Sequence, residues 1–130
     1  MTILVAYVPR PEGQAALDKG IEIATRNKER LFVVNASPGG SAEEPWRANA
    51  PDIDRVEKLL AKSGLDATFK QFVRGNTTVE EIEEMVGLHQ VSMVIIGLRR
   101  RSTVGKLLLG SVAQDILLTV SCPVLAVKAG

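Results

Sequence analysis

Residues 92–128, SMVIIGLRRRSTVGKLLLGSVAQDILLTVSCPVLAVK, contain a complete strand–helix–strand unit. Its first part, Ser92–Gly97, is a short apolar run with several β-branched residues, which is typical of a strand covered on both faces. A helix is expected to begin at Ser111, whose hydroxyl can cap the first turn, and to end before Pro123. Val124–Lys128 then has the composition of a second strand. Because parallel strands need a crossover of about a dozen or more residues, this unit predicts an α/β fold with a parallel sheet.

The rest of the chain continues this alternation of strands and helices. Three further strands are expected earlier in the chain: Thr2–Val8, Arg30–Ala36 and Asp66–Val73. Three further helices are expected between the strands, at about Glu12–Asn27, from Pro51 to Gly64, and from Thr77 or Thr78 onward. Either threonine has a glutamate three residues later, so a capping box is available in two registers. The order predicts one domain over residues 1–130, with a five-stranded, parallel, doubly wound sheet in a three-layer, flavodoxin-like arrangement.

Helical spacing of apolar residues indicates which helix faces pack on the sheet. The last helix is expected to direct Val112, Ile116 and Val120 toward the sheet. The third helix carries acidic residues that are predicted to form a solvated face: Glu80, Glu81, Glu83 and Glu84.

Composition excludes several classes of protein. The chain has 16 Lys and Arg against 15 Asp and Glu, a net charge of +1, so nucleic acid and anionic membranes are not expected as main partners. One cysteine, Cys122, and one histidine, His89, exclude a disulfide framework and a Cys/His zinc module. The N-terminus lacks the features of a signal peptide, and no stretch approaches the roughly 20 apolar residues of a membrane span. We therefore expect a cytoplasmic protein without a metal centre.

The end of the first strand excludes further chemistry. Tyr7-Val8-Pro9-Arg10 contains no carboxylate and no glycine-rich turn. A receiver-type phosphoacceptor needs acidic residues there, a dehalogenase-type phosphotransferase needs Asp-x-Asp, and a dinucleotide site needs Gly-x-Gly-x-x-Gly. With no general base beside a nucleophile either, catalysis is the least favoured function.

The segment after Ser92–Gly97 concentrates positive charge. Four cationic side chains occur there without an acid: Arg99, Arg100, Arg101 and Lys106. Gly97 permits close backbone approach, and Gly110-Ser111 opens a helix whose free N–H groups attract anions. Leu107 stands where a Walker A loop needs Ser or Thr, so this is another kind of anion site. The alternative is a basic loop that merely precedes a helix cap.

These features resemble the universal stress protein family over the whole chain. The segments that carry the resemblance are Ile3–Ala6, Gly75 with Ile82, Val94–Gly97, Gly110-Ser111 and Cys122–Lys128. The resemblance implies a five-stranded α/β domain, of the adenine nucleotide alpha-hydrolase-like type, that dimerises through its last strand, here Val124–Lys128. In one branch of the family ATP lies at the carboxyl ends of strands one and four, held by a Gly-x-x-Gly-x9-Gly-[Ser/Thr] motif.

The resemblance also implies a set of ligand-binding residues. The motif maps onto Gly97, Arg100, Gly110 and Ser111, with Arg100 in place of the second glycine. These residues would hold phosphates, Arg99, Arg101 and Lys106 would attract them, and Val112 belongs to the same predicted site. Tyr7, Val8 and Ala36 would wall the base and ribose, Ala36 through its backbone. Val8 stands where nucleotide-binding members carry Asp.

Two functions remain open at this stage. The favoured one is a stress-response sensor or regulatory module that binds ATP or another adenine nucleotide, with at most weak hydrolysis. The alternative is a dimeric interaction module of the same fold, which binds no nucleotide or holds another anion. The unusually long connection Pro38–Ala50 contains the one tryptophan, Trp46, and either covers a ligand or packs at the domain edge.

Overall fold

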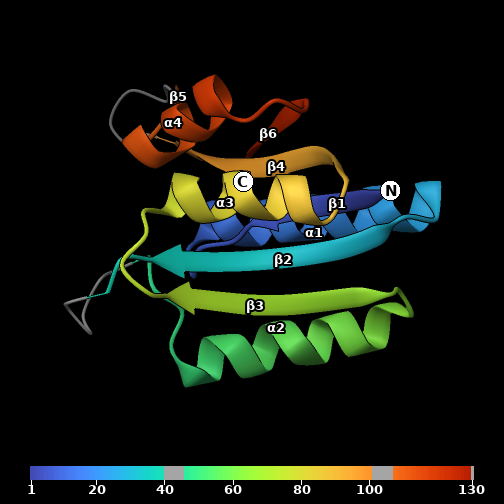
Figure 1. Cartoon of the computed structure of the whole chain (residues 1–130). Helices are drawn as coiled ribbons and strands as arrows, with labels where there is room; N and C mark the ends of the chain where they lie inside the picture. The colour runs from blue at the N-terminus through green and yellow to red at the C-terminus, as the bar shows by residue number, and fades with distance from the viewer. Residues whose placement is uncertain (40–45, 101–106, 130) are drawn as a thin grey trace.

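In the computed structural model, five parallel strands form a sheet in the order β3-β2-β1-β4-β6 (Figure 1). The structure describes residues 1–39, 46–100 and 107–129. The parallel strands are β1 (Thr2–Ala6), β2 (Arg30–Ser37), β3 (Ala67–Val73), β4 (Val91–Arg100) and β6 (Val124–Lys128). The helices are α1 (Pro11–Asn27), α2 (Ala50–Ser63), α3 (Thr78–Leu88) and α4 (Ser111–Thr119). The predicted fold class is confirmed.

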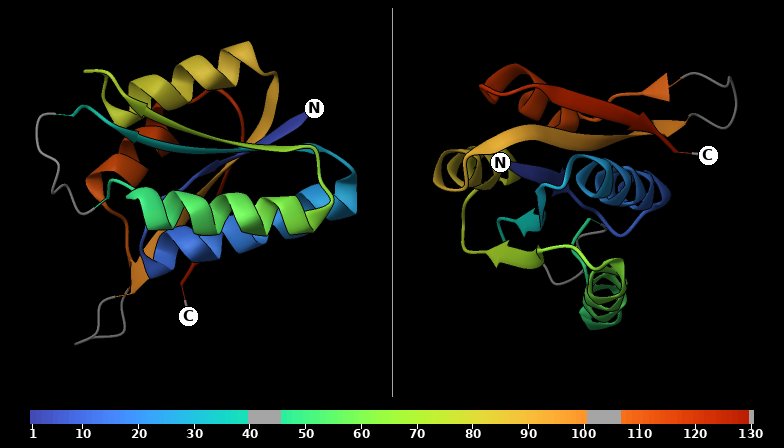
Figure 2. Two further views of the ribbon diagram at one scale, coloured as in Figure 1. Left: turned by 90° about the horizontal axis from the view of Figure 1, so that it is seen from below. Right: turned by 90° about the vertical axis from the view of Figure 1, so that its right-hand side faces the viewer.

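Each face of the sheet is covered by two helices. Alternate side chains of β1 point to opposite faces, as the two-residue period of a strand requires, so Ile3 and Val5 join one core and Leu4 joins the other. The first core includes α1 and α2 through Leu17 and Val56. The second includes α3 and α4 through residues such as Ile82, which is fully buried. Figure 2 shows the resulting three layers from two further directions.

The strand order changes direction beside β1. The chain builds outward from β1 to β2 and β3, and then returns so that β4 pairs with the other side of β1. Ligands of open α/β sheets bind at the carboxyl ends of the strands near such a point. This topology directs attention to the loops that follow β1 and β4.

Two helices begin with complete capping boxes. In α3 the Thr77 register is the one that forms, with the Thr77 amide donating to Glu80 Oε1 at 2.7 Å and the Glu80 amide donating to Thr77 Oγ1 at 3.2 Å. In α2 the sequence reading missed Asn49, which caps the helix through a reciprocal pair with Asp52. Gly64 ends α2 in the left-handed conformation, as expected.

Two expected strand ends need correction. β1 ends at Ala6 rather than Val8, although the Tyr7 amide still donates to the Val34 carbonyl. β4 continues past Gly97 to Arg100, because Leu107–Leu108 form a short antiparallel strand, β5, that pairs with its end. This local hairpin carries no hydrophobic alternation long enough to be recognised in a sequence.

The ends of α4 also differ from expectation. Gly110, not Ser111, is the N-cap residue, and in the described structure no side chain supplies the cap hydrogen bond. Ser111 already has helical geometry, so its predicted capping role is wrong. The helix ends at Thr119, and Val112 is exposed to solvent rather than packed on the sheet.

The acidic face predicted for α3 is wrong at one position. Glu81 is fully buried, and its two oxygens each accept a hydrogen bond from Arg74, from Nε and Nη2, at 2.7 Å. Arg74 also stacks over the Phe72 ring, with its guanidinium carbon 4.7 Å from the ring centroid. Glu81 is adjacent in sequence to the exposed Glu80. It can be buried because Arg74, which follows β3, neutralises its charge.

Candidate functional site

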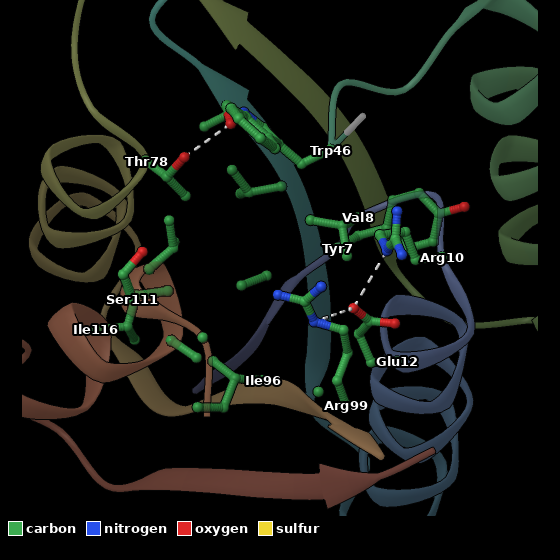
Figure 3. A pocket seen from close by; sticks show the side chains of 17 residues that line it. Tyr7, Val8, Arg10, Glu12, Trp46, Thr78, Ile96, Arg99, Ser111 and Ile116 are labelled. Carbon is green, nitrogen blue, oxygen red and sulfur yellow. Dashed lines mark hydrogen bonds and ion pairs between the residues drawn. The ribbon is translucent and has the colours of Figure 1, made fainter. Parts of the chain in front are cut away.

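A cavity of about 330 Å³ opens at the carboxyl ends of β1, β2 and β4 (Figure 3). Its described walls come from those strand ends, the start of α1, the residue Trp46, and the first turns of α3 and α4. This is the switch point of the sheet, so the topology and the cavity agree on where a ligand would bind.

Eight of the residues predicted from the sequence line this one cavity: Tyr7, Val8, Ala36, Gly97, Arg99, Gly110, Ser111 and Val112. They come from four separate parts of the chain, and the fold brings them together. Arg100 is the last residue of β4 and pairs with Leu107. Arg101 and Lys106 lie outside the described residues. The binding role assigned to all of these residues stays a prediction.

Tyr7 contributes less to the cavity than the sequence suggested. Its ring is buried in the core and makes an edge contact with Phe69 at 6.3 Å between centroids. The hydroxyl points away from the cavity (Figure 3). Burial raises the pKa of this phenol, while a hydrogen bond with Arg55 opposes the increase. The side chain of Tyr7 therefore packs in the core and interacts with Arg55 of α2. Its ring was expected to form part of the cavity wall.

Gly97 is needed for packing between a helix and a strand. A Cβ atom at this position would lie 2.0 Å from the carbonyl oxygen of Glu12 in the first turn of α1. Gly13 is equally restricted, because a Cβ there would lie 1.8 Å from the Val8 carbonyl oxygen. The two glycines let α1 start directly against β1 and β4, and so bring the first turn of α1 to the cavity.

That first turn carries a carboxylate that the sequence reading missed. Glu12 lines the cavity, and its Oε2 atom lies 3.5 Å from Arg10 Nε and 3.5 Å from Arg99 Nε (Figure 3). The Glu12 side chain is only 11% exposed. The available signal was an acid in the first turn of the helix after strand one, but nothing local indicated that Arg99 would meet it.

The opposite part of the cavity wall is apolar and aromatic. Trp46 lies there with Ala36 and Val34. The Asn35 side chain holds the segment in place: its amide nitrogen donates to the carbonyls of Tyr7 at 3.0 Å and Trp46 at 2.8 Å, and its oxygen accepts from the Ala48 amide at 2.9 Å. Trp46 therefore lies at the cavity, while residues 40–45 of the predicted connection Pro38–Ala50 lie outside the described residues, and the ligand-covering role stays a prediction.

The start of α3 is fastened to the same region. The Thr78 hydroxyl donates to the Ala36 carbonyl at 2.9 Å. This carbonyl, which was predicted to contact the nucleotide base, therefore already accepts one hydrogen bond. A carbonyl oxygen has a second lone pair, and the position remains part of the wall.

The third wall is the N-terminus of α4. Gly110 and Ser111 line the cavity, and the first-turn amides of this helix have no side-chain cap within the described structure. An Arg99 Nη2 atom lies 3.7 Å from where a Cβ of Gly110 would stand, so the guanidinium and the positive end of the helix dipole face the same space. Together they form an environment suited to an anion.

The two other chemically reactive side chains lie elsewhere. His89 borders a separate hollow at the amino ends of the strands, beside Phe32. Cys122 packs against the core under α3 and α4, and burial raises the pKa of its thiol. Within residues 1–39, 46–100 and 107–129, no cluster of three or more His, Cys, Asp or Glu side chains is arranged to bind a metal ion. The same ranges contain no helix with the length and hydrophobicity to cross a membrane.

Comparison with known proteins gives a consistent result. A model of the universal stress protein family matches residues 1–128. A universal stress protein from Mycolicibacterium smegmatis is 40% identical over 126 residues, which is 97% of this chain and 96% of that protein. The structure of a universal stress protein from Archaeoglobus fulgidus is 23% identical, with a TM-score of 0.78 and coverage of 98% of this chain and 97% of that one.

A second Archaeoglobus fulgidus structure, solved in complex with dAMP, is 21% identical with a TM-score of 0.69, and covers 98% of this chain and 96% of its own. At this identity the two solved structures support the fold. The family match and the Mycolicibacterium relative extend over almost the entire sequence. The chain therefore belongs to the universal stress protein family.

Proposed function

We propose that this protein binds an adenine nucleotide at the cavity between β1, β2 and β4, and acts as a regulatory or sensor module. The observation that carries the proposal is the division of the cavity wall into an apolar part and a positively charged part. One part of its wall is apolar and aromatic, with Trp46, Ala36 and Val34, and another presents Arg99 and the N-terminus of α4.

A nucleotide is divided in a complementary way. Its base is a flat aromatic group that gains from contact with apolar surface and an indole, and its phosphate is an anion that pairs with guanidinium groups and helix N-termini. The two ends of the cavity therefore match the two ends of the ligand. Val8 in place of an acid does not change this match, because the polar contacts of the phosphate lie on the other wall.

Solved members of the family support the ligand class. The Archaeoglobus fulgidus protein was solved with dAMP, another universal stress protein with cAMP, and a family protein from Arabidopsis thaliana with AMP. All three ligands are adenine nucleotides. We propose that the same class binds here.

Turnover is not part of the proposal. The carboxylate that lines the cavity, Glu12, is paired with Arg10 and Arg99 rather than placed beside a hydroxyl as a base. Incubation of the protein with ATP should release phosphate no faster than buffer alone. Release that increases with protein concentration would contradict this part of the proposal.

Nucleotide binding is tested by replacing Arg99. AMP titrated into the wild-type protein should change the fluorescence of Trp46 and release measurable heat. Arg99→Ala should weaken AMP by about ten- to a hundredfold, because a hydrogen bond to a charged group contributes roughly 1.5–3 kcal/mol. Adenosine, which lacks the phosphate, should bind both proteins with similar affinity.

The matched control is Arg26→Ala. Arg26 is an exposed arginine in the last turn of α1, paired with Glu22 at 3.8 Å. Its loss changes the net charge equally and should leave AMP affinity unchanged. Absence of heat and of any fluorescence change at millimolar AMP would reject the proposed function, and equal losses for AMP and adenosine would reject the phosphate role of Arg99.

We also propose a homodimer through β6. This strand pairs with β4 on one side, and α4, on the same side of the molecule, exposes Leu117 and Leu118 (Figures 1 and 2). An edge strand beside apolar surface is a template for pairing with another chain, and a second copy presents the identical edge. If nucleotide binding fails, this surface supports the alternative of a dimeric interaction module.

A further inference from the structure

Glu12 places a negative charge inside the proposed phosphate site. The charged side chains of the described cavity wall are Arg10, Arg99 and Glu12. One carboxylate oxygen of Glu12 lies 3.5 Å from the Nε atoms of both arginines. The side chains of Arg10 and Arg99 are 42% and 49% exposed, and each guanidinium has further N–H groups besides Nε that can bind a ligand.

Glu12 is held in this position by its backbone. The first turn of α1 packs so closely on β1 and β4 that neither Gly13 nor Gly97 has room for a Cβ atom. The Glu12 side chain is mostly buried and faces the cavity (Figure 3). A ligand that enters therefore meets the carboxylate, because the turn cannot move away without separating the helix from the sheet.

A bound phosphate would share the two guanidinium groups with this carboxylate. Like charges a few ångströms apart repel, and the repulsion is larger in a partly buried site than in water. The cost increases with the number of charges on the ligand. Adenosine has no phosphate and is not repelled by Glu12. A ligand with one phosphate is repelled to some extent, and a triphosphate is repelled most strongly.

We infer that Glu12 is a specificity-determining residue, whose charge disfavours adenine nucleotides with three phosphates more than those with one. The inference rests on the proposed nucleotide site and specifies its ligand further. It also gives Glu12 a role opposite to that of an ordinary binding residue, because removal of its charge should strengthen binding.

The experiment compares Glu12→Gln with the wild-type protein. Adenosine, AMP and ATP are titrated calorimetrically into each at one pH and one ionic strength, with a chelator present so that no divalent cation neutralises the phosphates. Glu12→Gln should strengthen ATP by about tenfold or more, strengthen AMP by a smaller factor, and leave adenosine unchanged. Since both proteins contain the same residues 101–106, the comparison isolates Glu12.

The matched control is Glu22→Gln. Glu22 lies on the same helix, is exposed, and pairs with Lys19 at 2.6 Å and Arg26 at 3.8 Å. This change alters the net charge by the same amount as Glu12→Gln. It should leave the affinities for all three ligands as they are in the wild type, and an equal gain for ATP would show a general charge effect and overturn the inference.

A fourth probe separates this inference from the proposed function. Inorganic tripolyphosphate carries the charge of ATP without the nucleoside. If adenosine and AMP bind neither protein, the proposed nucleotide site fails, whereas tighter tripolyphosphate binding by Glu12→Gln still supports the charge role of Glu12. If Glu12→Gln gains affinity for neither ATP nor tripolyphosphate, or loses affinity for adenosine, the inference is wrong.

Discussion

Gly97 is required because the first turn of α1 lies directly against β4. The sequence reading assigned this glycine to close approach of a ligand, but the backbone atom that occupies the space is the Glu12 carbonyl oxygen. The same contact sets where Glu12 stands relative to Arg99. At the scale of single residues, then, the glycine that lets α1 pack on β4 also sets the electrostatics of the cavity, and its predicted contact with a ligand stays a prediction.

Gly97→Ala should destabilise the protein. The new methyl group would stand 2.0 Å from a backbone oxygen, which cannot rotate away as a side chain would. Overpacking of this kind costs about 1–3 kcal/mol and occasionally more. The free energy of unfolding, measured by urea denaturation, should fall by at least that amount.

Gly87→Ala is the control for this substitution. Gly87 lies near the end of α3, and a Cβ there would meet no atom within 4 Å. Alanine in an unstrained helical position should raise the free energy of unfolding by about 0.4–1 kcal/mol. Equal stability of Gly97→Ala and the wild type would mean that α1 does not pack on β4 as closely as described.

At the scale of secondary-structure elements, the helix starts are set by short reciprocal hydrogen bonds. The capping box of α3 depends on the charge of Glu80. The pKa of Glu80 lies below its ordinary value of 4.5. The main cause is the hydrogen bond from the Thr77 backbone, and a hydrogen bond with the Thr77 side chain adds to it. A lowered pKa in the folded state means that this stabilisation is complete above that ordinary value and is lost as the pH falls through the lowered one.

The pH dependence of stability should therefore change in Glu80→Gln. In the wild type, acidification from about pH 4.5 down through the lowered pKa protonates Glu80 and removes its contribution. The glutamine cannot titrate, so the urea midpoint of Glu80→Gln should fall less steeply than that of the wild type in this acid range. Glu83→Gln, an exposed change on the same helix, is the charge-matched control. Parallel acid profiles for Glu80→Gln and the wild type would contradict the role of the capping box.

At the scale of the whole molecule, the proposed assembly depends on β6, which among the described strands pairs only with β4, and on the apolar side of α4. Leu118 is 75% exposed on α4, and Leu88 is 66% exposed at the end of α3. Of these two helices, α4 lies at the end of the sheet that carries β6, whereas α3 lies over the middle of the sheet (Figure 1). The two leucines therefore offer a test that separates a specific interface from general surface hydrophobicity.

The wild-type protein should sediment as a dimer at micromolar concentration. Leu118→Glu should weaken the dimer by about tenfold or more, because it places a charge in apolar contact surface. Leu88→Glu should leave the dimer intact. A wild type that sediments as a monomer would reject the dimer, and equal weakening by both substitutions would place the interface elsewhere.

Much of this architecture follows from local patterns in the chain. Apolar runs such as Ile3–Ala6 and Val94–Gly97 indicate strands because a strand buried on both faces consists almost entirely of apolar residues. This composition is visible in the sequence without knowledge of the strand's neighbours. The sequence indicates a helix start at Thr77 or Thr78 because a capping box needs residues only three apart, and the structure selects Thr77. The expected topology then followed from the rule that crossovers are right-handed.

Other features depend on pairs that are far apart in the chain, and short-range patterns do not encode them. The extension of β4 beyond Gly97 requires β5, and the burial of Glu81 requires Arg74 from the end of β3. The sequence indicates eight of the residues that line the cavity, each as a separate candidate. The ion pair between Glu12 and Arg99 emerged only on folding, because the distance between two charges is set by how α1 packs on β4, and that packing involves the whole sheet.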